Sequence, residues 1–449
     1  MVPHEASGGA TPLEGESRII GLRARRRIAT RILPFVFLLY VVAYIDRVNV
    51  SFASLRMNMD LGFSDTAFGL GSGMFYVSYV LFEIPGAIIV ERWSARKWIG
   101  RIMISWGLVT ILTGFVHTGG QFFVARFLLG LAEASFFPGM IVYLTRWFSL
   151  CDRSRAIACL YAANPTASLV GAPIAGWMLG VHWRWLAGWR WLFILEGIPA
   201  VVLGLVTIFY LTDWPSQARW LGERERKWLT NELDKELQAK NKIKDYTIAQ
   251  AFFNRRVLLL VVAYFLALSG ALGTIYWIPT FVTRLSRLPV RTVTSLLLVP
   301  AAMGIAGILA NGWHSDTTNE RRWHAAIPLL MAGLMYLAAV LVHRDTAATI
   351  VCLLLGSGFL YAYYPAFWAM PTMMLSRSAA AATYGLINSI GQLGGLAGPW
   401  AIGFLNDRTH SLTASFGLIA MVYFGAGSLM LGLRVENPVD SAGRPRPGR

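Results

Sequence analysis

Two pairs of opposite charges stand within long apolar stretches of the sequence. Asp46 is followed directly by Arg47, and Arg126 precedes Glu133 by seven residues. Because seven residues make two turns of an α-helix, Arg126 and Glu133 share one helix face. Charged side chains are costly in an apolar, membrane-like setting, and they usually face an interior path there. These four residues are therefore the first candidates for a functional site.

The chemistry open to these four side chains is anion binding coupled to proton uptake. A buried carboxylate stays ionised while an arginine pairs with it, and it takes up a proton when it is left alone. Arginine keeps its charge and offers a planar fork that matches a substrate carboxylate. The alternative is that Asp46–Arg47 and Arg126–Glu133 are internal ion pairs that only hold helices together. We favour it less, since burying four charges for structure alone is costly.

Other polar and aromatic residues extend this candidate site. Glu83 lies shortly before a Pro-Gly step, and packing, gating and substrate contact all remain open for it. For Glu196 we expect a structural role. Tyr44 and Tyr79 are candidate pocket walls. The second half of the chain carries no charge within its apolar stretches and offers these residues instead: Tyr276, Trp277, Tyr361, Tyr363, Tyr364, Trp368, Asn388 and Gln392.

Composition indicates that these residues belong to a membrane protein. The chain has 449 residues, of which 55% are hydrophobic and only 14% are charged, too little charge to cover a water-facing surface. Twelve apolar stretches approach the roughly 20 residues that a membrane-spanning helix needs. No stretch alternates in polarity as the strands of a membrane barrel do. We predict transmembrane helices at 32–54, 67–90, 98–117, 121–145, 156–180, 190–211, 256–283, 292–314, 325–343, 346–374, 380–404 and 412–434.

The net charge of +16 predicts the orientation of these helices. With the N-terminus in the cytoplasm, thirty of the 40 Lys and Arg residues fall in cytoplasmic segments, eight in outside loops and two within helices. This asymmetry favours cytoplasmic positions for both termini. The loop 284–291 is an exception, with three arginines outside. Because the basic residues spread over one membrane side, we expect a lipid bilayer and no nucleic acid as partner.

An internal repeat divides the twelve helices into two sets of six. Acids 225 residues apart each precede two basic residues at +5 and +6, and asparagines 224 residues apart each precede a glycine by seven. The residues concerned are Glu91 with Arg96 and Lys97, Asp316 with Arg321 and Arg322, Asn164 and Asn388. A hydrogen bond between helices and a substrate contact are both open for the asparagines. We favour substrate contact for Asn388, because the second half has few other polar groups.

The repeat predicts an all-α polytopic membrane protein with two parallel six-helix pseudo-repeats, a plan that secondary transporters use. We expect six-helix bundles at 32–211 and 256–434, a cytoplasmic linker at 212–255 with an amphipathic helix near 223–240, and cytoplasmic tails at 1–31 and 435–449. The first tail lacks the cleavage pattern of a signal peptide.

Several function classes are disfavoured. Three cysteines, no paired Cys/His spacing, no phosphate-binding glycine loop and no Ser/His/Asp set speak against a disulfide scaffold, a metal site, an ATP-driven pump and a hydrolase. We expect no cofactor and no metal. A membrane-embedded enzyme or a sensor would need a catalytic set or a signalling domain, and the sequence indicates neither.

The chain resembles the major facilitator superfamily, in its loops at 87–97 and 312–322. More specifically, it resembles the anion:cation symporter family. The matching segments are Tyr44-Ile-Asp46-Arg47-Val-Asn49, Arg126-Phe-Leu-Leu-Gly130-Leu-Ala-Glu133-Ala-Ser-Phe-Phe-Pro138-Gly139, the stretch 188–199, Asp213-Trp-Pro215 and the stretch 388–395. The resemblance covers nearly the whole chain, and the segment 126–139 is its most specific part.

The resemblance implies a monomeric, multi-pass carrier of the bacterial inner membrane that imports small organic acids with protons. It implies that Asp46 and Glu133 carry protons and that Arg47 and Arg126 bind the anion. Tyr44, Tyr79, Asn164, Asn388 and Trp368 would line the site. Gating or structural roles would fall to Glu91, Arg92, Arg96, Lys97, Asp316, Arg321 and Arg322. Residues 361–371 and 379–382 are similar to the tartrate-type branch; sugar acids, aromatic acids such as phthalate or hydroxyphenylacetate, and export or exchange remain alternatives.

Overall fold

A computed structural model of the chain describes residues 12–181, 186–240, 254–374 and 377–433. Almost all of these residues are helical, so the predicted all-α fold is confirmed. The expected tail at 435–449 and part of the expected linker, 241–253, lie outside the described residues. The amphipathic helix expected near 223–240 is present as α8, Glu223–Lys240.

The first six predicted spans are each found as a helix or a pair of helices. They are α1 (Pro12–Asp60), α2 (Asp65–Arg92), α3 (Ala95–Thr113), α4 (Gly119–Glu133) with α5 (Phe136–Thr145), α6 (Leu150–Met178) and α7 (Gly188–Tyr210). Side-chain caps define several starts. The Ser64 hydroxyl accepts a hydrogen bond from the Ala67 backbone, and Thr118 does the same for Gln121, which satisfies amide groups that a helix start leaves unpaired.

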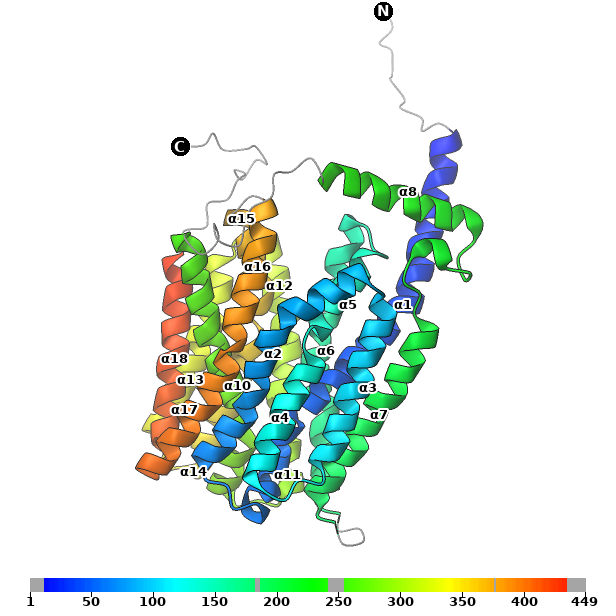
Figure 1. Ribbon diagram of the computed structural model, residues 1–449. Coiled ribbons are helices and arrows are strands. Elements are labelled where there is room, and N and C mark those ends of the chain that lie inside the picture. Colours follow the sequence, from blue (N-terminus) through cyan, green and yellow to red (C-terminus); the bar gives the residue numbers. More distant parts are fainter. Residues whose placement is uncertain (1–11, 182–185, 241–253, 375–376, 434–449) are drawn as a thin grey trace, which may run out of the picture.

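The second set of six follows the short helix η1 (Pro215–Gln217) and α8. It consists of α10 (Arg255–Ser286), α11 (Val290–Leu296) with α12 (Leu298–Thr318), α13 (Arg322–Leu341), α14 (Thr346–Gly358) with η2 (Phe359–Tyr361) and α15 (Tyr364–Met374), α16 (Arg377–Gln392) with α17 (Gly394–Thr409), and α18 (Leu412–Gly432). Among the described residues, nine of the twelve spans are long and apolar enough to cross a membrane. The other three, α2, α3 and α16–α17, lie alongside them in the bundle (Figure 1).

Four predicted helices are divided in the structure, and the break within 121–145 shapes the candidate site. Ser135 adopts a left-handed conformation with a φ of 68° between α4 and α5. Proline has no amide hydrogen, and its ring collides with the carbonyl four residues earlier in a helix. Pro138 would meet the carbonyl of Ala134, so the chain leaves the helix there. The break makes Glu133 the last residue of α4.

Both described ends of the chain lie on the same face of the bundle, which we name the terminal face; the opposite face is the far face (Figure 1). The first helix is much longer than expected, because it begins at Pro12 and projects beyond the bundle. There it packs against α8 and is held by ion pairs. Arg27 binds Glu225 at 2.8 Å, and Arg25 binds Asp152 at 3.2 Å.

The two halves meet tightly near the far face. The guanidinium of Arg284 on α10 makes two hydrogen bonds of 2.5 Å to the Asp65 carboxylate at the start of α2. Asp407 on α17 accepts hydrogen bonds from the backbone of Asp65 and Thr66, at 3.1 and 2.8 Å. A Cβ atom built at Gly403 would collide with the Asp65 carbonyl. These contacts close the interface between α2 and α17, and we name them the far-face latch.

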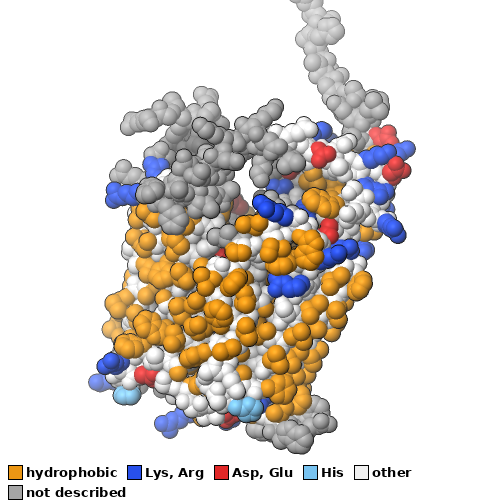
Figure 2. All heavy atoms as spheres, in the orientation of Figure 1, with side chains coloured by type: hydrophobic (Ala, Val, Ile, Leu, Met, Phe, Trp, Pro, Cys, Tyr) orange, Lys and Arg blue, Asp and Glu red, His pale blue; other side chains and the backbone are white. Residues whose placement is uncertain are grey.

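Surface polarity agrees with a membrane-spanning bundle. Figure 2 shows hydrophobic side chains over the middle of the molecule, while Lys, Arg, Asp and Glu gather toward its two ends. Large apolar side chains such as Phe209, Leu341 and Leu309 are among those exposed on the helices. A lipid environment would cover such side chains.

Candidate functional site

The centre of the candidate site is an ion pair between α1 and α4. Arg47 donates a hydrogen bond to the Glu133 carboxylate, and the Glu133 side chain is almost completely buried. The break after α4 positions this carboxylate at a helix end. As the alternative to a substrate site, the sequence suggested ion pairs between Asp46 and Arg47 and between Arg126 and Glu133. Both pairings are wrong. Adjacent residues on a helix point in different directions, so Arg47 turns toward α4 while Asp46 turns away.

Arg126 is the second cation of the site, and its guanidinium is incompletely satisfied. The residue is 1% exposed. One terminal nitrogen makes long hydrogen bonds to the Ser72 carbonyl, at 3.4 Å, and to the Tyr276 hydroxyl, at 3.5 Å. Its Nε and its other terminal nitrogen have no hydrogen-bond partner within the described part of the chain. A buried cation with unused hydrogen-bond donors is well suited to bind an anion.

The ring of Phe75 on α2 lies beside both cations. The guanidinium carbons of Arg47 and Arg126 each lie 5.2 Å from its centroid. Arg47 is also 5.3 Å from the ring of Tyr79, which stacks on Phe75 with centroids 5.6 Å apart. A ring face attracts a cation, so the two aromatic side chains help to keep both guanidinium groups at one place.

Asp46 does not join this group. Its carboxylate accepts hydrogen bonds from the Thr110 hydroxyl on α3, at 2.9 Å, and from the Asn49 amide, at 3.1 Å. Asp46 is buried between helices of the first half. The structure therefore gives the two acids of the predicted site different partners. Glu133 binds an arginine of the site, and Asp46 binds neutral groups on the side of α1 that faces α3.

Tyrosines of the second half reach across to the first. The Tyr276 hydroxyl on α10 contacts Arg126, lies 3.1 Å from the Tyr76 hydroxyl and donates to the Arg47 carbonyl at 3.3 Å. The Tyr44 hydroxyl lies 3.2 Å from the Tyr361 hydroxyl. Each of these contacts joins the two halves beside the arginines.

A further contact between the halves involves Glu83. Its carboxylate accepts hydrogen bonds from the Asn388 amide, at 2.7 Å, and from the Ser389 hydroxyl, at 3.2 Å. The related Asn164 on α6 is buried, and its side-chain oxygen has no partner among the described residues. Trp368 is half-buried in an aromatic cluster, with ring centroids 5.1 Å from Tyr264 and 5.4 Å from Tyr384.

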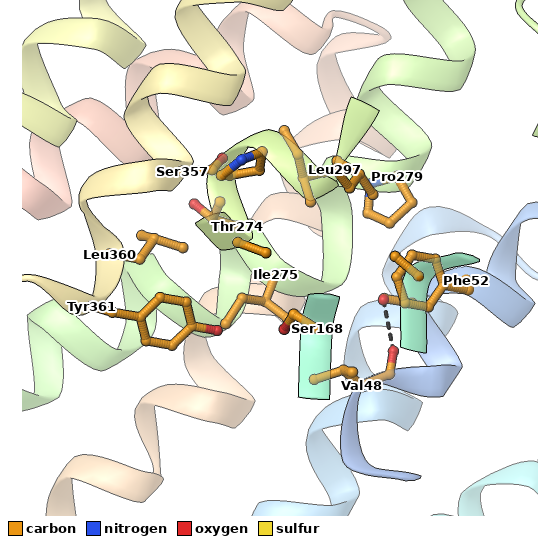
Figure 3. Close-up of a pocket in the computed structure, with 15 residues that line it drawn as sticks. Val48, Phe52, Ser168, Thr274, Ile275, Pro279, Leu297, Ser357, Leu360 and Tyr361 are labelled. Carbon is orange, nitrogen blue, oxygen red and sulfur yellow. Dashed lines mark hydrogen bonds between the residues drawn. The ribbon is translucent and has the colours of Figure 1, made fainter. Parts of the chain in front are cut away.

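A pocket lies farther toward the far face than the Tyr44–Tyr361 contact. Figure 3 shows that its lining comes from α1, α6, α10, η2 and neighbouring segments. None of the described residues that line it is charged; apolar side chains stand beside the hydroxyl groups of Ser51, Ser168, Thr274, Ser357 and Tyr361. A hydrogen bond of 3.3 Å between Ser54 and Thr280 lies beyond the pocket on α1 and α10, and the far-face latch follows.

The two repeated loops use different acids on the terminal face. In the second loop Asp316 binds Arg321 at 2.6 Å, while Arg322 lies 6.0 Å from the Trp323 ring. The first loop binds Asp213, which follows α7. Ser94 and the Arg96 backbone donate hydrogen bonds to this carboxylate, and the Arg96 side chain pairs with it at 3.2 Å. Arg92 and Lys97 are exposed, and the Glu91 side chain lies outside the described part.

Sequence reasoning missed Phe75, Tyr76 and Ser389 as members of the site, and it noted Tyr276 only as a polar residue of the second half. Tyr76 could have been found, because it lies three residues before Tyr79 on the same helix face. Phe75 carried no distinguishing signal among the 25 phenylalanines. Its role depends on the packing of α1, α2 and α4.

Comparison with known proteins agrees with this architecture. A family model described as Major Facilitator Superfamily matches residues 36–399. A relative from Agrobacterium vitis, named "Putative tartrate transporter", is 42% identical over 417 residues, which cover 91% of this chain and 93% of the relative. A relative from Acinetobacter baumannii, named "Quinolone resistance transporter", is 34% identical over 399 residues and covers 88% and 92%.

Among solved structures, the chain is similar to the inward open conformation of the xylose transporter XylE from E. coli. The TM-score is 0.71 at 12% identity, and the match covers 89% of this chain and 95% of that chain. At this identity the likeness concerns the fold.

Proposed function

This chain belongs to the major facilitator superfamily, and on that premise we propose that it imports a small organic carboxylate together with protons. It is a multi-pass membrane transporter and not an enzyme. The proposed substrate is a hydroxy acid such as tartrate or a sugar acid. Transport would proceed by alternating exposure of the site to the two sides of the membrane.

The observation that carries the proposal is the unsatisfied guanidinium of Arg126. A buried charge without a full set of partners is costly, and two of the three Arg126 nitrogens lack a partner in the described residues. A substrate carboxylate would supply both the charge and the planar pair of acceptors that these donors need. Tyr276 and Tyr76 would then contact the same anion from the two halves.

Proton coupling follows from competition for Arg47. In the structure Glu133 holds Arg47; a carboxylate that bound both arginines would take this partner from Glu133. The released acid would be left buried and alone, and it would take up a proton. Anion and proton would then favour each other's binding, by a coupling on the order of 1–3 kcal/mol. Asp46 is the second proposed proton carrier, on the side of α1 that faces α3.

The remaining proposed site residues line the path or join the halves. Tyr44 and Asn388 contact partners in the other half, Tyr79 stacks on Phe75, and Asn164 has an unused oxygen in the described structure. We propose that these residues and Trp368 shape the substrate pocket. The ion pairs of Arg96 and of Arg321 support gating roles for the two repeated loops.

For orientation we propose the bacterial inner membrane with the terminal face in the cytoplasm, as the distribution of Lys and Arg supports. Both tails and the linker 212–255 would then be cytoplasmic, and the closed latch would face outward. A reporter fused within the linker should give a cytoplasmic signal. A periplasmic signal there would overturn this orientation. We propose a monomer as the working unit.

Two observations support other substrates. The aromatic cluster of Tyr264, Tyr364, Phe367 and Trp368 would suit an aromatic acid. The name of the Acinetobacter relative would suit export or exchange on the same fold. Competition of labelled tartrate uptake by phthalate tests the first alternative, and quinolone efflux from cells tests the second.

The proposal is tested with the purified full chain in proteoliposomes. Labelled tartrate should accumulate under an imposed inward proton gradient, and a proton uncoupler should abolish the accumulation. Arg126→Ala should remove uptake, while its folded state is checked by melting temperature. Uptake that ignores the gradient would exclude proton symport, and uptake that is unchanged in Arg126→Ala would exclude this residue as the anion site.

A further inference from the structure

Glu196 on α7 is a buried acid that the proposed import cycle does not use. It is 9% exposed, and its Oε2 atom has no hydrogen-bond partner among the described residues. Asn49 lies within hydrogen-bonding reach of it, and Asp46 is the charged group that acts on it most directly. The Asn49 amide also donates to Asp46. Two carboxylates from α1 and α7 thus share one asparagine.

No cation contacts this group of three residues in the described structure. Asp46 accepts from Thr110 and Asn49 alone; Glu133 and Arg126 on α4 act on it only through space. Along α7 the next charged residue toward the far face is Arg190, which donates to the Gly114 and Val116 carbonyls. It lies six residues, or about 9 Å of helix, from Glu196. Thr110 is the contact from α3.

The hydrogen bonds distinguish the states of the two acids. Both Asp46 oxygens accept from neutral donors, which suits an ionised carboxylate. Glu196 Oε2 and Asn49 Oδ1 are both buried acceptors without a donor. One proton on Glu196 would neutralise this carboxyl group and remove the cost of a second buried negative charge beside Asp46. Two ionised carboxylates side by side without a cation would be much costlier.

We propose that Glu196 is a further proton-binding site of this protein, in addition to Glu133 and Asp46, and that it exchanges its proton with Asp46 beside Asn49. The exchange moves one proton between two carboxyl groups, so one acid is neutral whenever the other is ionised. This inference rests on the proposed proton-coupled import for its use in transport, but not for its existence.

The position of the site makes a proton path separate from the substrate path. Helix α1 runs toward the far face, so Asn49 lies about 4.5 Å beyond Asp46 in that direction. Glu196, eight residues after the start of α7 at Gly188, lies near this farther residue. Under this proposal a proton would pass between Glu196 and Asp46, on the side of α1 that faces away from Arg47 and Arg126.

Close packing keeps this group away from water. A Cβ atom built at Gly197 would lie 2.6 Å from the Gly107 carbonyl, and one at Gly107 would lie 2.8 Å from the Gly197 carbonyl. The backbones of α3 and α7 therefore touch directly beside Glu196. Small residues permit such approach between membrane helices, and no room is left for a hydration shell around a charged carboxylate.

Infrared spectroscopy of the purified, substrate-free protein tests the protonation state. The wild-type chain should show the carbonyl stretching band of a protonated carboxylic acid at neutral pH. Glu196→Gln, which keeps a donor toward Asn49 and should fold normally, should lower this band. Glu133→Gln is the matched control and should leave it, because Arg47 keeps Glu133 ionised. A band that is absent in the wild type, or unchanged in Glu196→Gln, would overturn the proposal.

Transport tests the use of the proton. With labelled tartrate in proteoliposomes, gradient-driven accumulation should fall roughly tenfold or more in Glu196→Gln, the scale expected for a lost coupling. Exchange without a gradient should stay within about twofold of the wild-type rate. Undiminished accumulation would also overturn the proposal. If the wild type does not carry tartrate, the proposed function fails on its own, and the infrared comparison still decides whether Glu196 holds a proton.

Discussion

The far-face latch should set how often the transporter opens toward that side, and Arg284→Gln is the change that weakens it. The wild-type guanidinium makes two hydrogen bonds of 2.5 Å to Asp65 across the two halves. Glutamine removes the charge and one of these bonds. The hydrogen bonds of Asp407 to the start of α2 remain, so the variant should still close.

The expected effect is about one kcal/mol. The Arg284 side chain is 43% exposed and that of Asp65 is 11% exposed, so solvent screens the pair and its contribution stays near that of a well-formed surface ion pair, about 1 kcal/mol. Since RT is about 0.6 kcal/mol, the population open to the far face should rise about fivefold. The bidentate geometry places the estimate at the upper end of the range for surface pairs.

Cysteine labelling measures this population. Ser54 is buried behind the latch and bonded to Thr280, so Ser54→Cys in a chain without its three native cysteines reports opening. A membrane-impermeant maleimide added to intact cells should label it about fivefold faster in Arg284→Gln than in the parent. Arg291→Gln removes a charge from the same loop without removing an ion pair in the described structure, and it should label at the parental rate. A change below about twofold in Arg284→Gln would refute the latch argument.

Four other changes test the site and its support. Arg126→Ala should lower tartrate uptake by a factor of 100 or more, roughly the loss of two charge-assisted hydrogen bonds, and Arg126→Lys should restore only part, because lysine lacks the planar fork; initial uptake rates decide this. Glu133→Gln should keep counterflow exchange but lose proton-driven accumulation, and undiminished accumulation would remove Glu133 from the mechanism. Tyr276→Phe should raise the KM for tartrate about fivefold or more by removing one hydrogen bond to the anion, whereas an unchanged KM would place its hydroxyl outside the site. Gly197→Ala should lower the melting temperature, since overpacking costs roughly 1–3 kcal/mol, while Gly417→Ala, with open space around it, should not; equal melting temperatures would contradict the close packing of α3 and α7.

The sequence was sufficient for the helices and insufficient for their pairings. Apolar length predicted all twelve spans, because membrane helices must satisfy their backbone internally and over a fixed thickness. It did not predict that Arg47 meets Glu133, since helix rotation depends on packing between α1 and α4. Spacing along one helix suggested Arg126 with Glu133, but the break after Glu133 turns that carboxylate toward α1.

Two local signals could have been used more fully. Pro138 marked a place where the helix could break, although Pro85 and Pro199 lie inside continuous helices. The arginine-rich loop 284–291 departed from the expected charge asymmetry, and the structure gives a reason for one of its arginines: Arg284 binds Asp65. An acid 219 residues away in the sequence supplies that reason, so counting charges loop by loop could not reveal it.

The contact between α2 and α17 has a mechanical consequence. Most helices pack with the side-chain ridges of one in the grooves of the other, and changing their crossing angle then requires the ridges to disengage. Where Gly69 faces the Pro399 carbonyl and Gly403 faces the Asp65 carbonyl, backbone lies against backbone and there are few ridges to release. Helices that touch in this way can change their crossing angle at little cost. This backbone contact between the halves is thus also suited to act as a pivot for their rotation, which the polar bonds of the far-face latch at its rim oppose.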